Sequence, residues 1–474
     1  MAAHAALAAW PILQAVFKCF DKLKTAVEMV HENERSRYQI KMEVDMLKTI
    51  LFPLQERPSM MEDSGIRTAV EKLGEIFELA QNGCEKGSTL AKLGRARADA
   101  QKLRQMLDRI FRGVVFVNAA LNLNTNCMLR ELAKSNGIQS TGRSGEEGAK
   151  NTVPPPSDSL PPENTLEKYP FGEVEKAVDP KHCIGEGGSG NVYEGKLRGK
   201  VVAIKEFHML DQYKSPEFID KLIQLLSKLQ HENIVEHLGH SRRKKNLKSP
   251  EDTDRRYKEE KDPGKFFLVT KYMDNDCLKP IIKGRKTICW PTHFSIIQGL
   301  AKGLRYLHEK SIVHLDLKPS NILLDAEMIP KINDFGTARE LDQEGDVIKL
   351  DTDHLPGTDS LRGYMPLELM TQGFASFKSD VYSFGVLLLE TLGRICTGSE
   401  IFPDRPMGPN EWIILVNGVS ELKNLFNREQ LSDHGIKIAI NCLIMGLRCC
   451  QTDPTDRPFM DEVVEQLAAT QQFS

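Results

Sequence analysis

The chain has 474 residues, of which 40% are hydrophobic and 27% charged, and its formal net charge is -3. That length exceeds one ordinary domain, and the near-neutral charge gives no general attraction to nucleic acid, so no nucleic-acid partner is expected. The ten scattered cysteines contain no Cys-x-x-Cys pair, which argues against a zinc site or a disulfide framework and favours a reducing, cytoplasmic compartment.

The N-terminal segment, residues 1–17, is apolar and rich in alanine but lacks a basic flank. Pro11 and Lys18 interrupt it well short of the length that crosses a membrane. The segment therefore predicts neither a signal peptide nor a transmembrane helix. We interpret it as part of a helix that packs into the domain that follows, and a lipid-contacting segment is the alternative.

Apolar residues recur with a helical period from residue 11 to about 134. The four apolar stripes are Ile12, Val16, Leu23, Val27 and Val30; Ile40, Val44, Leu47 and Leu51; Ile66, Val70, Leu73 and Phe77; and Leu93, Ala96, Ala100, Leu103, Leu107, Ile110 and Val114. Helices with short connections bury such stripes on each other. The pattern predicts a bundle of about four helices over residues 1–134.

The fourth predicted helix is the one place where local charge departs from the average. Eight Lys or Arg stand between Lys86 and Arg112, against two Asp. One interpretation is a solvated face. The other is attraction to anionic lipid, which would make the protein peripheral at the plasma membrane, or to an acidic partner. Residues 1–134 are accordingly expected to contact a membrane surface or partner helices.

The next segment, residues 135–168, is predicted to be a linker. Up to Pro162 it consists largely of Gly, Ser, Asn and Pro, including three consecutive prolines at 154–156. Such a stretch buries too little to offset the entropy of ordering it. A second domain is predicted from residue 169 to residue 474.

A glycine-rich motif opens the second domain. Gly185, Gly187 and Gly190 have the spacing G-x-G-x-x-G, which alone is a weak signal. The residues that follow read as strands and not as a helix, which favours a flap over phosphates. Lys205 ends the run Val-Ala-Ile-Lys behind this flap, where its ammonium could meet the α- and β-phosphates of a nucleotide.

The stretch from Ile312 to Asp334 contains the closest grouping of candidate catalytic residues. It reads His314-Leu315-Asp316-Leu317-Lys318-Pro319-Ser320-Asn321 and then Asp334-Phe335-Gly336. A carboxylate, an ammonium and an amide stand within six positions, and a second carboxylate follows. These groups suit the handling of a metal-bound phosphate.

These motifs, with Asp380-Val381-Tyr382-Ser383-Phe384-Gly385 and Asp456-Arg457-Pro458, occur in the order and spacing of eukaryotic protein kinases. The sequence around Asp316 resembles that of plant receptor-like cytoplasmic kinases. The N-terminal half resembles the helical bundles of plant mixed-lineage-kinase-like and Mid1-complementing-activity proteins.

The resemblance implies an α-helical bundle followed by a two-lobed α+β kinase fold, with an antiparallel sheet in the N-lobe and a mostly helical C-lobe. It implies ATP and Mg²⁺ as cofactors and a protein substrate, and Lys318 favours Ser or Thr as the acceptor. The implied catalytic residues are Asp316, Lys318 and Lys205, the metal ligands are Asn321 and Asp334, and the nucleotide-binding residues are Ile184, Gly185, Gly187, Gly190, Val192, Ala203 and Lys205. Glu368 is expected to pair with Arg457, and Asp380 to brace the catalytic loop.

The sequence departs from the family in four places. Leu222 stands where a helix acid is expected to pair with Lys205, and Leu315 replaces the arginine that often precedes the catalytic Asp. Four residues separate Thr358 from Gly363 where the family usually has one, and Pro-Leu-Glu stands for Ala-Pro-Glu at 366–368. The segment 342–359 is acidic, which we interpret as a solvated loop, although it could repel ATP.

Two functions remain open from the sequence. The first is an ATP- and Mg²⁺-dependent protein serine/threonine kinase that its bundle recruits to a membrane or partner. The second is a nucleotide-binding pseudokinase that switches the bundle, which would then be the effector. The complete set of Lys205, Asp316, Asn321 and Asp334 favours the first, and Leu222 and the altered Pro-Leu-Glu at 366–368 favour the second. A pure interaction scaffold is the remaining alternative.

Overall fold

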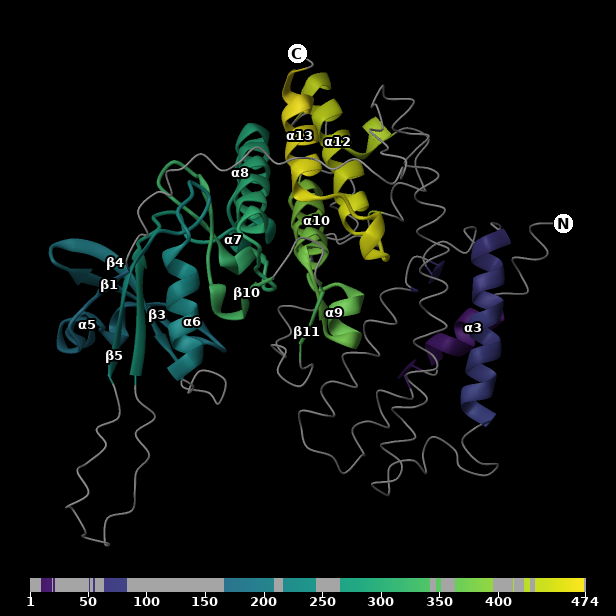
Figure 1. Cartoon of the computed structure of the whole chain (residues 1–474). Coiled ribbons are helices and arrows are strands. Elements are labelled where there is room, and N and C mark those ends of the chain that lie inside the picture. The colour runs from purple at the N-terminus through teal and green to yellow at the C-terminus, as the bar shows by residue number, and fades with distance from the viewer. Residues whose placement is uncertain are drawn as a thin grey trace, which may run out of the picture.

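The structure is a computed structural model (Figure 1). The residues it describes are 10–18, 20–21, 51, 54–55, 64–82, 166–208, 216–243, 265–341, 347–350, 363–394, 412, 422–426 and 431–472. Among the helices in these ranges, none is long and apolar enough to cross a membrane.

In the N-terminal region the described residues are helical. Helix α3 (Ser64–Asn82) is the third helix that the periodicity predicted, and its stripe residues Ile66, Val70 and Leu73 are buried. Residues 10–18 are also helical. The fourth predicted helix and most of the linker lie outside the described residues, so the four-helix bundle stays a prediction.

A six-stranded sheet forms the first part of the kinase-like domain, in the order β1-β5-β6-β4-β3-β2. Its strands are β1 (Glu167–Lys168), β2 (Cys183–Gly187), β3 (Gly190–Leu197), β4 (Lys200–Phe207), β5 (His237–Arg243) and β6 (Lys265–Lys271). Five of them pair antiparallel as predicted, whereas the edge strand β1 pairs with β5 in parallel. Two helices accompany the sheet, α5 (Phe171–Ala177) and α6 (Pro216–Ser227).

The second lobe is mostly helical, as predicted. Its helices are α7 (Lys279–Ile282), α8 (Trp290–Glu309), α9 (Leu367–Gln372), α10 (Phe377–Gly393), α12 (Asp433–Cys449) and α13 (Met460–Gln472). Its short strands pair as β7 (Ile312–Val313) with β10 (Arg339–Glu340), β8 (Ile322–Leu324) with β9 (Pro330–Ile332), and β11 (Ile348–Lys349) with β12 (Phe374–Ala375). One-turn 3₁₀ segments are η3 (Pro180–His182), η5 (Pro319–Asn321), η6 (Phe335–Thr337), η10 (Leu422–Leu425) and η11 (Pro454–Asp456).

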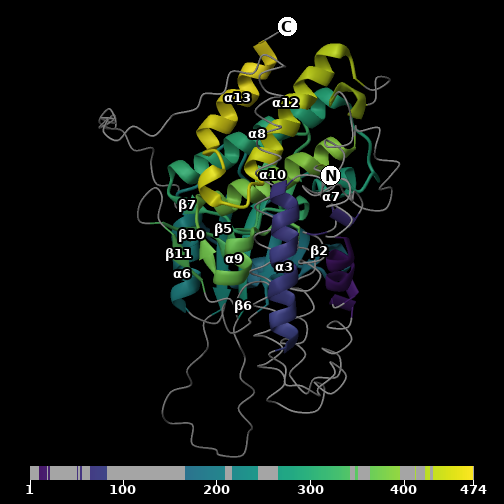
Figure 2. The same cartoon turned by 90° about the vertical axis from the view of Figure 1, so that its right-hand side faces the viewer.

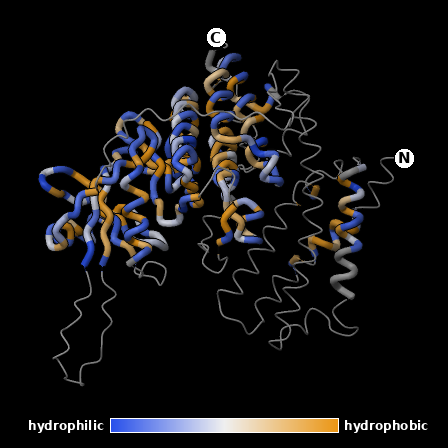
Figure 3. The backbone as a smooth tube through the Cα atoms, in the orientation of Figure 1, coloured by the Kyte–Doolittle hydropathy of each residue, from blue (hydrophilic) through white to orange (hydrophobic). Residues whose placement is uncertain are grey.

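Helix α10 is the centre of this lobe. Ser376 caps its start in a reciprocal box with Ser379, and nearly all of its residues are buried. A helix that is hydrophobic on every side must be enclosed by other elements. Helices α8 and α12 pack on it, and α13 packs in turn on α8 and α12 (Figures 1 and 2); hydrophobic residues follow α10 along its length (Figure 3). Gly385 permits the approach of α12, because a Cβ there would lie 2.6 Å from Cys449 Cβ.

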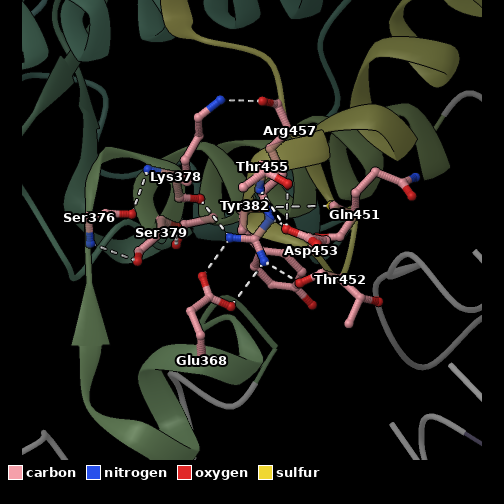
Figure 4. A network of polar contacts seen from close by, with 12 residues as sticks. Glu368, Ser376, Lys378, Ser379, Tyr382, Gln451, Thr452, Asp453, Thr455 and Arg457 are labelled. Carbon is pink, nitrogen blue, oxygen red and sulfur yellow. Dashed lines mark hydrogen bonds and ion pairs between the residues drawn. The ribbon is translucent and has the colours of Figure 1, made fainter. Parts of the chain in front are cut away.

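A buried ion pair joins two distant segments of the lobe (Figure 4). Arg457 Nη1 lies 2.6 Å from Glu368 Oε1, and Nη2 donates to Oε2 at 3.0 Å. The Arg457 side chain is 1% exposed, and its remaining N–H groups donate to the carbonyl oxygens of Gln451, Lys378 and Thr452. Burial of this charge is therefore fully compensated, and the pair expected from the sequence is present.

We predict that Arg457→Leu destabilises the protein by about 3–5 kcal/mol, because Glu368 would remain buried without its cation. The matched control is Arg448→Leu, which removes an ion pair to Glu462 that is about one-third exposed, with side-chain exposures of 33% and 30%. That change should cost about 1 kcal/mol or less. Chemical denaturation of the two variants measures the difference, and equal losses would contradict it.

Candidate active site

The catalytic loop begins directly after β7, and a carboxylate from α10 fixes its backbone. Asp380 is completely buried; its Oδ2 accepts the His314 N–H at 2.7 Å, and its Oδ1 accepts the Leu315 N–H at 2.8 Å. Leu315 has a φ of 64°, a conformation that costs a non-glycine residue energy unless its surroundings enforce it. The two hydrogen bonds to Asp380 hold the backbone of Leu315 in this conformation.

Asp316 lies at the centre of a closely bonded group. Lys318 Nζ is 2.9 Å from both of its carboxylate oxygens, and Asn321 Nδ2 donates to its Oδ2 at 2.9 Å and to its backbone oxygen at 2.8 Å. Burial raises the pKa of Asp316 above its ordinary value, while the adjacent Lys318 opposes that rise. The residue types that the sequence singled out between 316 and 321 thus meet in one place.

Asp334 brings the two lobes into contact. Lys205 Nζ, from β4, lies 2.7 Å from Asp334 Oδ1. Burial alone would raise the pKa of Asp334, but the charge and hydrogen bond of Lys205 outweigh it and lower that pKa to about 2. Ser189, in the glycine-rich turn, contributes a weaker hydrogen bond from its Oγ to Oδ2 at 3.5 Å.

Phe335 follows Asp334 and lies between two histidine rings. Its ring centroid is 5.1 Å from that of His314 and 5.6 Å from that of His237, both in edge-to-face geometry. Burial lowers the pKa of His237 to about 4, so the ring that packs here is neutral. His314 Nδ1 accepts the Asp316 N–H at 3.2 Å, which leaves Nε2 to donate to the Asn333 oxygen at 3.0 Å.

The glycine-rich hairpin of β2 and β3 packs directly on β4. Gly187 pairs with Gly190, and Val192 pairs with Lys205 in the next strand over. A Cβ at Gly190 would lie 2.2 Å from the Glu206 backbone oxygen, so only glycine fits. Ile184 on this hairpin is 50% exposed, a large apolar side chain without a cover in the described part of the chain.

Ala203 completes the set of residues that the resemblance assigned to nucleotide binding. It lies on β4 between Glu194 of β3 and Thr270 of β6. The structure thus brings Val192, Ala203 and Lys205 together on neighbouring strands. The hairpin that carries Ile184, Gly185, Gly187 and Gly190 forms the adjacent edge of the sheet.

Helix α6 carries no acid at the position facing Lys205. Leu222 is 6% exposed and belongs to the same apolar cluster as Ile219, Leu226 and Phe335, and α6 packs against η6. Its neighbour Asp220 instead approaches Arg242, at 3.7 Å. Among the described residues Asp334 pairs with Lys205 at 2.7 Å, so Lys205 is held although Leu222 replaces the helix acid.

At Leu315, too, apolar packing takes the place of a charged residue that the family often has. It is buried with Val313, Leu341, Leu369 and Phe377 in a small apolar cluster beside the catalytic loop. Its place next to Asp316 is therefore secured by packing. The wider spacing between Thr358 and Gly363 predicts that the threonine that docks the substrate in this family is displaced, with Thr358 or Ser360 in its place. The segment 351–362 lies outside the described residues, so this stays a prediction.

Three contacts of the site escaped the sequence analysis. They are the ring of His237 against Phe335, the Ser189 hydroxyl on Asp334, and the hydrogen bond from Thr337 Oγ1 to the His314 oxygen at 3.0 Å. Ser189 lies inside the glycine-rich motif, which was a usable signal. His237 had none, because a histidine in a strand is unremarkable in sequence.

The donor set fits a magnesium–nucleotide complex. Asp334 offers an ionised carboxylate, and Asn321 uses its Nδ2 on Asp316, which leaves its amide oxygen as a ligand. Mg²⁺ takes one or two such oxygens and fills its other positions with phosphates and water. Asn321 contacts Asp316, and Asp334 contacts Lys205. A triphosphate held by Lys205 would lie beside these two ligands.

Comparisons with known proteins agree with this geometry. The model of the protein kinase domain matches residues 178–467. The chain belongs to the protein kinase family. The prediction of a protein kinase fold in the second domain is confirmed to that extent, while the assigned boundaries at residues 134 and 169 remain predictions.

Related proteins are found among plant receptor-like kinases. Cysteine-rich receptor-like protein kinase 27 of Arabidopsis thaliana is 36% identical over 312 residues, 64% of this chain and 44% of that protein. G-type lectin S-receptor-like serine/threonine-protein kinase SD1-29, from the same plant, is 35% identical over 310 residues, 65% of this chain and 36% of its own length. A probable LRR receptor-like serine/threonine-protein kinase, RFK1, is 35% identical over 316 residues, 63% and 28% respectively.

The chain therefore spans less than half the length of these curated relatives. The similarity supports the receptor-like part of the resemblance and the serine/threonine class of the kinase domain. The family model begins at residue 178 and does not include the predicted N-terminal bundle.

We predict that Leu222→Ala destabilises the protein by about 2–5 kcal/mol, because it leaves a cavity in the apolar face that holds α6. The control is Asp220→Ala, two positions away on the exposed face, which should change stability by less than about 0.5 kcal/mol. Denaturant titration of both variants makes the comparison. A large loss with Asp220→Ala would mean that the ion pair to Arg242 anchors the helix.

Proposed function

We propose that the protein transfers the γ-phosphoryl group of ATP to Ser or Thr hydroxyls of protein substrates. The observation that carries the proposal is the joint presence of Asp316, Lys318 and Asn321 in direct contact with one another, beside the Lys205–Asp334 pair. Phosphoryl transfer needs positioning and neutralisation of charge more than covalent chemistry. The family and the serine/threonine kinases among its relatives support the same activity.

Each residue has a distinct task in this proposal. Asp316 orients the acceptor hydroxyl and accepts its proton, and Lys318, 2.9 Å away, neutralises the charge that develops on the transferred group. Lys205 binds the α- and β-phosphates. Asp334 and Asn321 hold the magnesium ion, which when bound supplies Lewis-acid neutralisation of the phosphate oxygens.

The sheet supplies the remaining nucleotide contacts. Ile184, Val192 and Ala203 offer an apolar surface for the base, and the hairpin of Gly185, Gly187 and Gly190 covers the phosphates. The exposure of Ile184, at 50%, supports this role, because a base stacked on it would remove apolar surface from water.

We predict that Asp316→Asn lowers kcat by about 10²–10⁴-fold, because the amide can no longer accept the proton. The measurement is transfer of labelled phosphate from Mg-ATP to a generic Ser/Thr substrate. A shift of the melting temperature by Mg-ATP should persist in the variant, which shows that its nucleotide site is intact.

Two results would contradict this proposal. Equal transfer by the unmutated protein and Asp316→Asn would mean that the signal comes from another enzyme. Nucleotide binding without any transfer by the unmutated protein would favour the alternative, a nucleotide-binding pseudokinase that switches the N-terminal bundle.

We also propose that residues 1–134 act as a recruitment module and make the cytoplasmic protein peripheral at the plasma membrane. The support is the excess of eight Lys or Arg over two Asp between Lys86 and Arg112. Clustered cations of this kind are attracted to anionic lipid.

For this module we predict that the full chain sediments with phosphatidylserine liposomes at low salt and is released as salt rises. Reversal of Lys92, Arg95 and Lys102 to Glu should abolish the binding. Sedimentation that survives these reversals, or that never occurs at low salt, rejects the lipid role.

A further inference from the structure

A cluster of positive charge surrounds α7, outside the group that handles phosphate. The α7 patch consists of Lys279, Lys283, Arg285, Lys286 and Arg394. From Cys277 to His308 the chain has six Lys or Arg and neither Asp nor Glu. Lys279, Lys283 and Arg285 are exposed, and their side chains make no hydrogen bond or ion pair with the residues that the structure describes.

The other two cations of the patch, Lys286 and Arg394, do contact neighbouring residues. Lys286 donates to the neutral amide oxygen of Asn275 at 3.0 Å, so its charge is not compensated. Arg394, at the end of α10, lies against Gly284: a Cβ there would be 2.2 Å from Arg394 Nη2. Gly284 has a φ of 68°, a conformation that favours glycine, and the turn brings the Arg394 guanidinium beside Gly284, between Lys283 and Arg285 in the chain.

Two acids stand nearby, on the segment that precedes α7. Asp276 Oδ1 accepts the N–H of Cys277 at 2.6 Å, and Asp274 is exposed. The five cations of the patch outnumber these two carboxylates, so among these described residues the patch keeps a positive surplus. A surplus of one sign on an exposed surface attracts ligands of the opposite sign.

The patch is attached to the catalytic loop. The Leu278 N–H donates to the Ile322 oxygen at 2.8 Å, the Asn275 N–H donates to the Leu324 oxygen at 3.1 Å, and the Leu324 N–H donates to the Asp276 oxygen at 2.9 Å. Helix α7 also packs on η5, the turn that contains Asn321. The patch is therefore joined through β8 and η5 to the loop that carries Asp316. Residues that flank an acceptor extend from it by about 3.3 Å each in an extended chain, which defines the scale of the surface that they sample.

We propose that the α7 patch binds acidic side chains that flank the acceptor Ser or Thr in the protein substrate. The inference rests on the proposed kinase function and adds a substrate class to it. A membrane is the less favoured partner, because Ile281 and Ile282 of α7 are 2% and 1% exposed and the helix offers lipid no apolar face.

The test uses three fluorescent peptides with the same central Ser, flanked by Asp and Glu, by Gln, or by Lys. Fluorescence anisotropy gives their Kd for the full chain, and kinase assays give kcat/KM. The patch variant is Lys283→Glu with Arg285→Glu. The control is Lys196→Glu with Lys200→Glu, exposed lysines of β3 and β4, which changes the net charge by the same amount.

We expect the acidic peptide to bind the unmutated protein and the control variant about tenfold more tightly than it binds the patch variant. The loss of two surface ion pairs accounts for a change of this size. The difference should shrink with salt. Equal binding of the three peptides, or equal losses in both variants, overturns the inference. So does patch-dependent binding of phosphatidylserine vesicles with peptide binding unchanged.

Failure of the proposed kinase function gives a different result. Peptides would then bind in the charge-dependent manner described, and none would be phosphorylated. Because Kd is measured without turnover, the docking surface is decided independently of the activity.

Discussion

The ion pair between Lys205 and Asp334 is the contact on which the rest of the site depends. It joins a strand of the sheet to the segment between β9 and η6, and it compensates a carboxylate whose pKa burial alone would raise. Because Phe335 follows Asp334 directly, the same pair holds that ring between His237 and His314. One electrostatic contact thus sets both the metal-binding carboxylate and the packing behind it.

A second buried carboxylate works by different means. Asp380 is compensated mainly by backbone N–H groups, and it fixes the loop that carries Asp316 to the most buried helix of the lobe. The loop is therefore rigid whether or not Lys205 is in place. The two carboxylates have different roles. Asp380 orders the catalytic loop within the helical lobe, and Asp334 joins the sheet lobe to it through Lys205.

Apolar packing replaces charge where the chain departs from its family. Leu222 lies in the core beneath α6, and Leu315 lies in the cluster beside the catalytic loop. Packing of this kind is not switched by adding or removing a phosphate, in contrast to a pair of charges. Positive charge gathers on the α7 patch, where Lys279, Lys283 and Arg285 are exposed. Apolar packing thus secures positions 222 and 315, while the contacts of Asp334 and Asp380 hold the rest of the site.

The sequence by itself determined the residue types that do the chemistry, because they lie within short motifs such as 184–192 and 314–321, and it determined helices with a clear period, such as α3. Only the tertiary structure decided which partner Lys205 has, since Asp334 is 129 residues away. The same is true of His237 against Phe335 and of Arg394 against Gly284. Such pairs depend on how whole elements pack, and a local period carries no information about which distant residue comes to lie opposite.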